Sequence, residues 1–149
     1  MIETLPLTPI ESWQAQLRQV ITSVDDLLDL LQLQRHEVGY SEQAESDFPL
    51  RVPLAFVRRM RAGDPADPLL LQVLASADEL QVTPGYSGDP VGECGTANPQ
   101  PGIIHKYRGR VLLMVASICA INCRYCFRRH FPYEQNQNSR REWREALSY

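Results

Sequence analysis

No part of this sequence is apolar for long enough to cross a membrane. A span needs about 20 predominantly apolar residues, and the longest apolar run, from Val111 to Ala116, has six. The N-terminus from Met1 to Leu7 also lacks the basic segment and long apolar run of a secretory signal peptide. These absences predict a soluble, cytoplasmic protein with no membrane partner.

Cysteine is scarce and unevenly placed. Three of the four cysteines, Cys119, Cys123 and Cys126, lie within eight residues. In a reducing cytosol such a cluster is more often a metal or redox site than a disulfide framework. The fourth, Cys94, lies in a connection rich in glycine and proline, and we expect it to be a bystander.

Lysine is almost missing, since Lys106 is the only one, and the charges are divided unequally along the chain. The net charge is −3, yet residues 106–149 carry nine basic and three acidic side chains, whereas residues 1–105 carry six basic and fifteen acidic ones. The cationic region contains the cysteine cluster. It predicts contact with nucleic acid or with an anionic ligand such as a phosphate or carboxylate; a solvated basic face is the alternative.

The first hundred residues predict short helices joined by turns. Capping residues and prolines mark helix starts at Thr8, Ser23, Pro53 and Asp67. The helical spacing of apolar residues after Thr8 places Trp13 in the core. Residues 83–102 hold four prolines and five glycines, which predicts an extended connection.

The apolar run from Val111 to Ala116 predicts a strand covered on both faces, as in a parallel sheet. The segment from Ser139 to Leu147 has the capping spacing and apolar pattern of a helix. The order strand, loop, helix indicates an α/β protein. One buried strand needs neighbours on both sides, so we expect a longer parent chain, unless the strand pairs with residues 83–102.

The cysteines follow the predicted strand with the spacing C-x3-C-x2-C. Three thiolates can bind three irons of a four-iron cluster and leave the fourth iron open to a ligand. Zinc is the rival, because His130 could complete a Cys3His set. That alternative describes a small zinc-binding module with a basic nucleic-acid-binding face, in which these aromatic residues alternate with arginines: Tyr125, Phe127, Phe131 and Tyr133.

The cysteine spacing, Cys119-Ala-Ile-Asn-Cys-Arg-Tyr-Cys126, resembles the signature of the radical S-adenosylmethionine enzymes. Three further blocks narrow the resemblance to the lysine 2,3-aminomutase family, and to its branch that makes β-lysine for elongation factor P. They are Asp64-Pro-Ala-Asp-Pro-Leu69, Asp89-Pro-Val-Gly92 and Pro101-Gly-Ile-Ile-His-Lys-Tyr107, with Cys126-Phe-Arg-Arg-His-Phe-Pro-Tyr133 following the cysteines.

The resemblance implies an isomerase that converts (S)-α-lysine to (R)-β-lysine. Its cofactors would be a [4Fe–4S] cluster, S-adenosylmethionine and pyridoxal 5′-phosphate, and an electron donor would reduce the cluster. The cluster ligands would be Cys119, Cys123 and Cys126. Arg128 would hold the substrate carboxylate, with a surface arginine as the alternative. Contacts to pyridoxal phosphate would come from Lys106, Tyr107 and Arg110. The alternative is that these three residues are ordinary surface cations or packing residues.

The resemblance also implies a fold and a limit. Residues 1–104 would form a helical N-terminal region with an extended connection, and residues 105–149 the start of a partial TIM-type radical S-adenosylmethionine barrel. The family's glycine-rich segment, its covalent pyridoxal phosphate lysine and its acidic groups for the substrate ε-ammonium have no counterpart here. We therefore expect the sequence to be an N-terminal fragment that is inactive alone.

Overall fold

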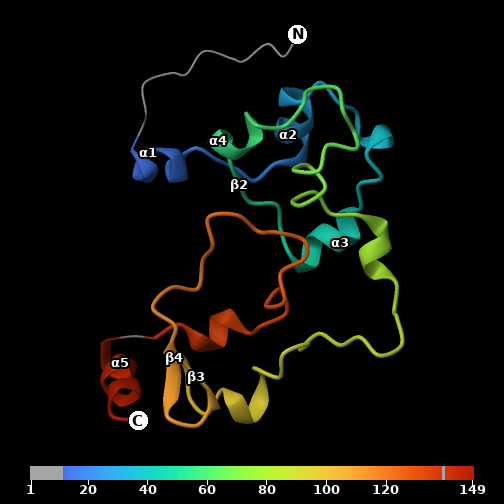
Figure 1. Cartoon of the computed structure of the whole chain (residues 1–149). Helices are drawn as coiled ribbons and strands as arrows, with labels where there is room; N and C mark the ends of the chain where they lie inside the picture. The colour runs from blue at the N-terminus through green and yellow to red at the C-terminus, as the bar shows by residue number, and fades with distance from the viewer. Residues whose placement is uncertain (1–11, 139) are drawn as a thin grey trace. The chain divides into compact units, whose positions relative to one another are not determined.

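The computed structural model describes residues 12–138 and 140–149, and the chain forms two compact units (Figure 1). The first unit runs to Leu80 and includes Ala120–Arg124, and the second consists of Gln81–Cys119 and Tyr125–Tyr149. The boundary predicted between residues 104 and 105 stays a prediction about the parent protein.

The regular elements of the described residues are short. The first unit contains α1 (Trp13–Arg18), β1 (Val20–Ile21), α2 (Val24–Leu30), η1 (Arg35–Glu37), α3 (Glu42–Asp47), β2 (Val52–Pro53), α4 (Leu54–Val57) and η2 (Ala77–Leu80). The second contains η3 (Gly95–Ala97), β3 (Ile103–Tyr107), β4 (Arg110–Leu113), η4 (Tyr133–Asn136) and α5 (Arg140–Leu147).

The core of the first unit is built around α2. The Ser23 hydroxyl accepts a hydrogen bond from the Asp26 amide at 3.2 Å, so the predicted N-cap is confirmed. The leucines of α2 then meet apolar side chains from β2, α4 and the segment after Asp67. The buried cluster comprises Val24, Leu27, Leu28, Leu31, Leu33, Leu50, Val52, Val57, Met60, Leu70, Val73 and Leu74.

Three local expectations for the first unit need correction. Trp13 is 67% exposed, so its assignment to the core was wrong; the helix start expected at Thr8 lies outside the described residues. The helix expected to start at Pro53 is a single turn, α4, which ends at Val57. Asp67 accepts hydrogen bonds from the Leu69 and Leu70 amides, but only turns follow. Short helices depend on tertiary packing, so capping signals do not fix their length.

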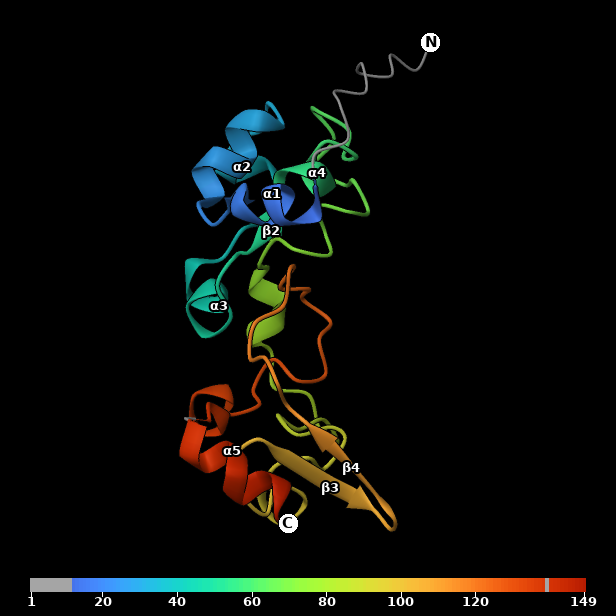
Figure 2. The same cartoon turned by 90° about the vertical axis from the view of Figure 1, so that its left-hand side faces the viewer.

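The second unit contains an antiparallel hairpin, β3 with β4, in which Ile103 pairs with Leu113 and Tyr107 with Arg110 (Figure 2). β4 covers only part of the predicted strand, and all of its residues are exposed. The expectation of a strand buried on both faces was therefore wrong for this chain. Within the described residues β4 pairs with β3 alone, so it is not part of a larger sheet.

Asn136 connects the hairpin to the segment that follows the cysteines. Its buried side-chain oxygen accepts hydrogen bonds from the Gly102 amide at 2.9 Å and from the Asn98 side chain at 2.8 Å. Gly102 has a φ of +81°, and a Cβ there would collide with the Asn138 amide. This network positions the start of β3, and α5, the helix predicted after Ser139, follows it.

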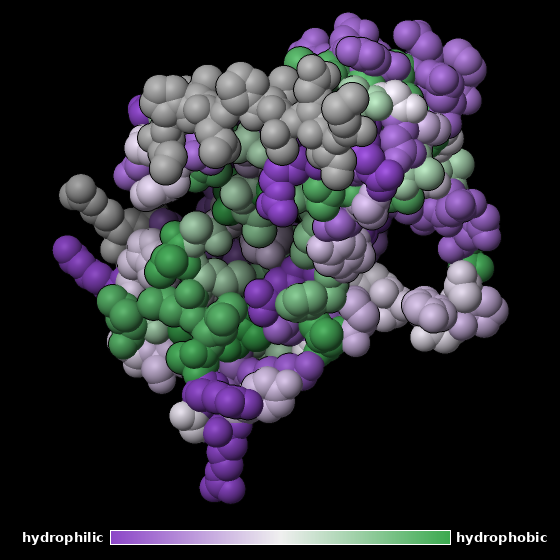
Figure 3. All heavy atoms as spheres, turned by 45° about the horizontal axis from the view of Figure 1, so that its top comes forward, coloured by the Kyte–Doolittle hydropathy of each residue, from purple (hydrophilic) through white to green (hydrophobic). Residues whose placement is uncertain are grey.

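Apolar side chains gather in one area of the surface (Figure 3). The exposed ones of the second unit include Val111, Leu112, Leu113, Val115 and Ile118. None of the helices in the part of the chain that the structure describes has the length and apolar character of a membrane span.

Replacing Leu27 with alanine is expected to lower the free energy of unfolding of the first unit by about 2–5 kcal/mol, because the side chain is fully buried. Leu30→Ala is the matched control on the same helix, since Leu30 is 53% exposed; it should change the value by about 0.5 kcal/mol or less. Urea unfolding followed by circular dichroism measures both. Equal losses would contradict the assigned core.

Candidate anion and cysteine site

Four of the residues predicted to bind cofactor or substrate line one cavity of about 260 Å³ in the second unit. The hairpin contributes Lys106, Tyr107 and Arg110, while Arg128 comes from the segment after the cysteines. The remaining lining residues are Glu93, Ile104, Val111 and Leu112. The structure therefore brings together residues that are separated by about twenty positions in the sequence.

Arg128 is held by a two-pronged ion pair with Glu93. Arg128 Nε donates to Glu93 Oε2 at 2.6 Å, and Nη2 donates to Oε1 at 2.9 Å. Both side chains are partly buried. Hydrogen bonding to Arg128 holds the pKa of Glu93 below its usual value, and the same bond raises the pKa of Arg128. Arg128 also lies 4.9 Å from the centre of the Phe127 ring.

A tight loop presents Glu93 to the cavity. The Asp89 carboxylate accepts hydrogen bonds from the Glu93 amide at 2.8 Å and the Cys94 amide at 2.9 Å. These bonds lower the pKa of Asp89. Burial, and then the Asp89 charge, raise the pKa of the Cys94 thiol. Cys94 thus belongs to the loop that orients Glu93, and its neutral thiol suits that structural position.

The hairpin cations stack on the Tyr107 ring. Arg110 lies 4.6 Å from the ring centre and Lys106 lies 5.7 Å from it. Lys106 Nζ also donates a hydrogen bond to the Val91 carbonyl, which ties the hairpin to the loop that carries Glu93. Both cations are exposed, so a ligand can reach them.

The cavity has an excess of positive charge, because three cations face one carboxylate. Guanidinium groups offer several N–H donors in a planar fork that matches carboxylate and phosphate oxygens. Glu93 engages only two of the five N–H bonds of Arg128. The arrangement can therefore bind an anionic ligand beside Glu93.

The three clustered cysteines lie on an irregular loop and are not joined in a disulfide. Cys119 is exposed, while Cys123 and Cys126 are half-buried. Among residues 12–138 and 140–149, no three histidine, cysteine or acidic side chains are arranged to hold a metal ion. Three thiolates are the donor set that an iron–sulfur cluster requires, so the residues fit a cluster in chemistry, whereas their side chains are not gathered around one point.

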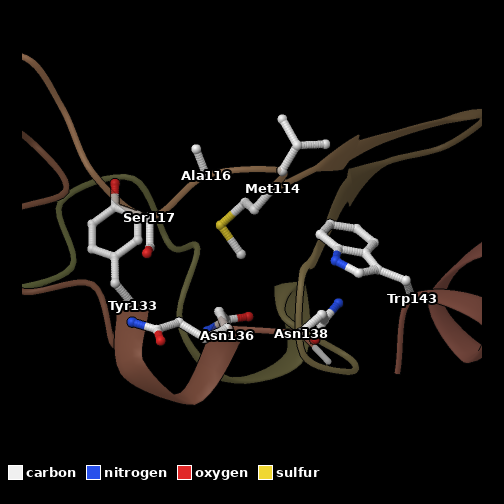
Figure 4. Close-up of a pocket in the computed structure, with 9 residues that line it drawn as sticks. Met114, Ala116, Ser117, Tyr133, Asn136, Asn138 and Trp143 are labelled. Carbon is white, nitrogen blue, oxygen red and sulfur yellow. The ribbon is translucent and has the colours of Figure 1, made fainter. Parts of the chain in front are cut away.

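The chain segments that flank the cysteines meet at a second cavity, of about 180 Å³ (Figure 4). Met114 and Ser117 lie before the cysteines and Tyr133 lies after them; Figure 4 shows the Met114 thioether pointing into the space beside Trp143 and Asn136. Burial chiefly raises the pKa of Tyr133, Arg128 opposes this, and the Cys119 and Cys126 thiols add to it.

The aromatic residues of the nucleic-acid alternative do not form a common exposed surface. Tyr125 and Phe127 are exposed, but Phe131 is buried and packs edge-on against Tyr133, with ring centres 5.1 Å apart. His130 is exposed. A stacking platform needs accessible ring faces, so only two of the four aromatic residues suit one.

Glu93 is the functional residue that sequence reasoning missed. Its partner Arg128 lies 35 positions further along the chain, and no local pattern connects them. The available signal was the Asp89-Pro-Val-Gly92 block, because Asp-Pro and glycine indicate a tight turn that here presents the next residue, Glu93.

No family model matches the chain. Three curated proteins named L-lysine 2,3-aminomutase do match it over nearly its whole length. The protein of Escherichia coli (strain K12) is 48% identical over 149 residues, covering 99% of this chain. The protein of Haemophilus influenzae is 42% identical over 97% of the chain, and that of Buchnera aphidicola is 43% identical over 93%.

The chain belongs to the lysine 2,3-aminomutase family. The resemblance inferred from the cysteine spacing and the flanking blocks is thereby confirmed at the level of the family. This aminomutase-family chain spans less than half of the three relatives' own length, at 43%, 44% and 41%. The relatives' names describe isomerases that act on L-lysine.

Replacing Arg128 with glutamine is expected to raise the pKa of Glu93, because the hydrogen bonds that lower it are lost while partial burial remains. The pair stabilises the second unit above the ordinary glutamate pKa, and this contribution disappears as the pH falls through the lowered value. Carboxyl NMR titration measures the shift. Arg108→Gln, at an exposed arginine of the same hairpin, is the control and should leave Glu93 unchanged.

Proposed function

We propose that this chain is part of an enzyme that converts L-lysine to β-lysine by moving the amino group from C2 to C3. The observation that carries the proposal is the cationic cavity lined by Lys106, Tyr107, Arg110 and Arg128. Family membership supports the reaction class. The activity belongs to a protein that includes the part of the relatives that this chain does not span, and we propose that the chain alone is inactive.

In this proposal Arg128 binds the lysine carboxylate. The side-on edge of its guanidinium, Nε with Nη2, already engages the Glu93 carboxylate. The N–H bonds of Nη1 lie outside that pair and are suited to a second carboxylate. Partial burial strengthens such a charge-assisted contact, because the competing water is partly excluded.

We assign Lys106, Tyr107 and Arg110 to the phosphate of pyridoxal phosphate. Two cations and a phenol provide charge and hydrogen-bond donors suited to phosphate oxygens. Lys106 is the only lysine, and its bond to the Val91 carbonyl supports a charge-bearing role at the cavity rim. The lysine that bonds this cofactor covalently must then come from outside the chain.

We assign Cys119, Cys123 and Cys126 to three irons of a [4Fe–4S] cluster. The thiolates would hold the cluster, and the exposed position of Cys119 leaves the loop accessible for its insertion. When bound, the cluster with S-adenosylmethionine supplies the radical chemistry, and pyridoxal phosphate supports the nitrogen migration. The cluster requires an electron donor.

Three further parts of the proposal rest on the sequence. The product would be (R)-β-lysine used to modify elongation factor P, the reaction would occur in the cytoplasm, and the parent fold would be a radical S-adenosylmethionine barrel. β4 supports the last point indirectly, since an exposed apolar strand is suited to pairing with further strands.

Anaerobic reconstitution of the chain with iron and sulfide is expected to give about four irons per chain, with an electron paramagnetic resonance signal after reduction that changes on adding S-adenosylmethionine. Cys123→Ala should lose the cluster, because a ligand is removed. Cys94→Ala is the matched control and should keep it. Stoichiometric zinc without a cluster in a folded chain would instead favour the zinc module.

The catalytic test uses this chain joined to the part of the Escherichia coli relative that the alignment leaves uncovered. Production of β-lysine from lysine by this chimaera would support the reaction, and an inactive chimaera with cluster and both cofactors bound would contradict it. Arg128→Lys is expected to lower kcat/KM for lysine by about 10- to 100-fold, since an ammonium group cannot keep the two-pronged pair with Glu93 and also offer the Nη1 N–H bonds to the substrate carboxylate. Arg108→Lys is the control and should leave kcat/KM unchanged.

A further inference from the structure

Arg124 lies inside the cysteine motif, directly after Cys123, and its side chain is only 6% exposed. Four of the five N–H bonds of its guanidinium are engaged within the first unit. Nε and Nη2 donate to the Glu79 carboxylate, with the shortest distance 2.6 Å, Nη1 donates to the Phe48 carbonyl at 2.5 Å, and Nη2 donates to the Ala44 carbonyl at 3.0 Å. A surface arginine would have no such set of partners.

One carbonyl acceptor, Phe48, is the C-cap of α3, and the other, Ala44, is the third residue of this six-residue helix. The last carbonyls of a helix lack partners within the helix and carry partial negative charge. Arg124 satisfies one such terminal carbonyl, that of Phe48, and also lies 5.5 Å from the centre of the Phe48 ring. The site therefore offers a guanidinium both a carboxylate and a helix terminus.

The neighbours of Arg124 are held by the same unit. The Arg124 amide donates to the Gln72 carbonyl at 2.7 Å. Asn122 donates from its amide to the Arg51 carbonyl at 2.9 Å and from its side chain to the Pro49 carbonyl at 3.0 Å. Ile121 packs against the apolar core. Cys123 thus lies between Asn122 and Arg124, each of which is hydrogen-bonded to the first unit through both its backbone amide and its side chain.

We propose that Arg124 is a positioning residue. It anchors residues 121–124 to the rest of the first unit and thereby fixes the location and accessibility of the Cys123 thiol. This anchoring follows from contacts that do not involve a metal. Its consequence for a cluster, that Cys123 is held in position as a ligand, rests on the proposed function.

Arg124→Gln tests the anchor in the 149-residue chain. The neutral glutamine side chain cannot replace the charged pair with Glu79, so residues 121–124 should detach from the rest of the first unit. Alkylation by iodoacetamide under native conditions, followed for each cysteine by peptide mass spectrometry, is expected to speed up at Cys123 by at least about tenfold, while the rate at Cys119 stays the same. An unchanged rate at Cys123 would overturn the proposal.

Two comparison variants distinguish detachment of residues 121–124 from a general destabilisation of the first unit. Arg58→Gln changes an exposed arginine of the same unit and should alter neither rate. Leu27→Ala destabilises the core without touching the anchor, so at a temperature where it remains folded the Cys123 rate should stay near that of the unaltered chain. If Leu27→Ala accelerates Cys123 as much as Arg124→Gln does, the anchor is not specific and the proposal fails.

Iron reconstitution then tests the consequence for the cluster. Arg124→Gln is expected to bind less iron or to give an altered electron paramagnetic resonance signal, with Arg124→Lys partly restoring it. Faster Cys123 alkylation together with an unaltered cluster would overturn the positioning role. Failure of the unaltered chain to take up any cluster would count against the proposed function, and the alkylation rates would still decide whether Arg124 anchors Cys123.

Discussion

A guanidinium that is removed from water needs a carboxylate or several carbonyls beside it, and the segment that carries the cysteines meets this requirement twice. Arg124 is paired with Glu79 within the first unit, and Arg128 is paired with Glu93 within the second. Partial burial lowers the local dielectric, so losing either partner would leave an uncompensated charge. These two pairs determine where the residues around Cys123 and Cys126 lie within their respective units.

The two arginines have different tasks although only four positions separate them. Arg124 has four of its five N–H bonds engaged by protein acceptors, which suits a structural anchor. Arg128 faces a cavity with Lys106 and Arg110 and retains unused N–H bonds, which suits a ligand. Residue type alone does not distinguish them; the difference lies in the number of acceptors that surround each guanidinium.

Local chemistry was predictable where one turn of chain contains all the partners. Three features follow from residues within four positions of one another. They are the Ser23 cap, the hydrogen bond from the Leu69 amide to the Asp67 carboxylate, and the helix α5. Predictions that needed packing information failed. Trp13 has helical apolar spacing but is 67% exposed, and α4 ends after one turn although the apolar pattern continues. Periodicity identifies an apolar face and does not show what covers that face.

The sequence by itself determined the chemistry that the chain can offer: three thiols at cluster spacing, a cationic second part, a single lysine, and the family. Only the tertiary structure decided which charges meet. It pairs Glu93 with Arg128 and Glu79 with Arg124 across 35 and 45 positions, and it leaves β4 exposed on an isolated hairpin. The physical reason is that motif spacing is a local property, whereas ion pairing and burial depend on distant segments that approach one another only in the folded chain.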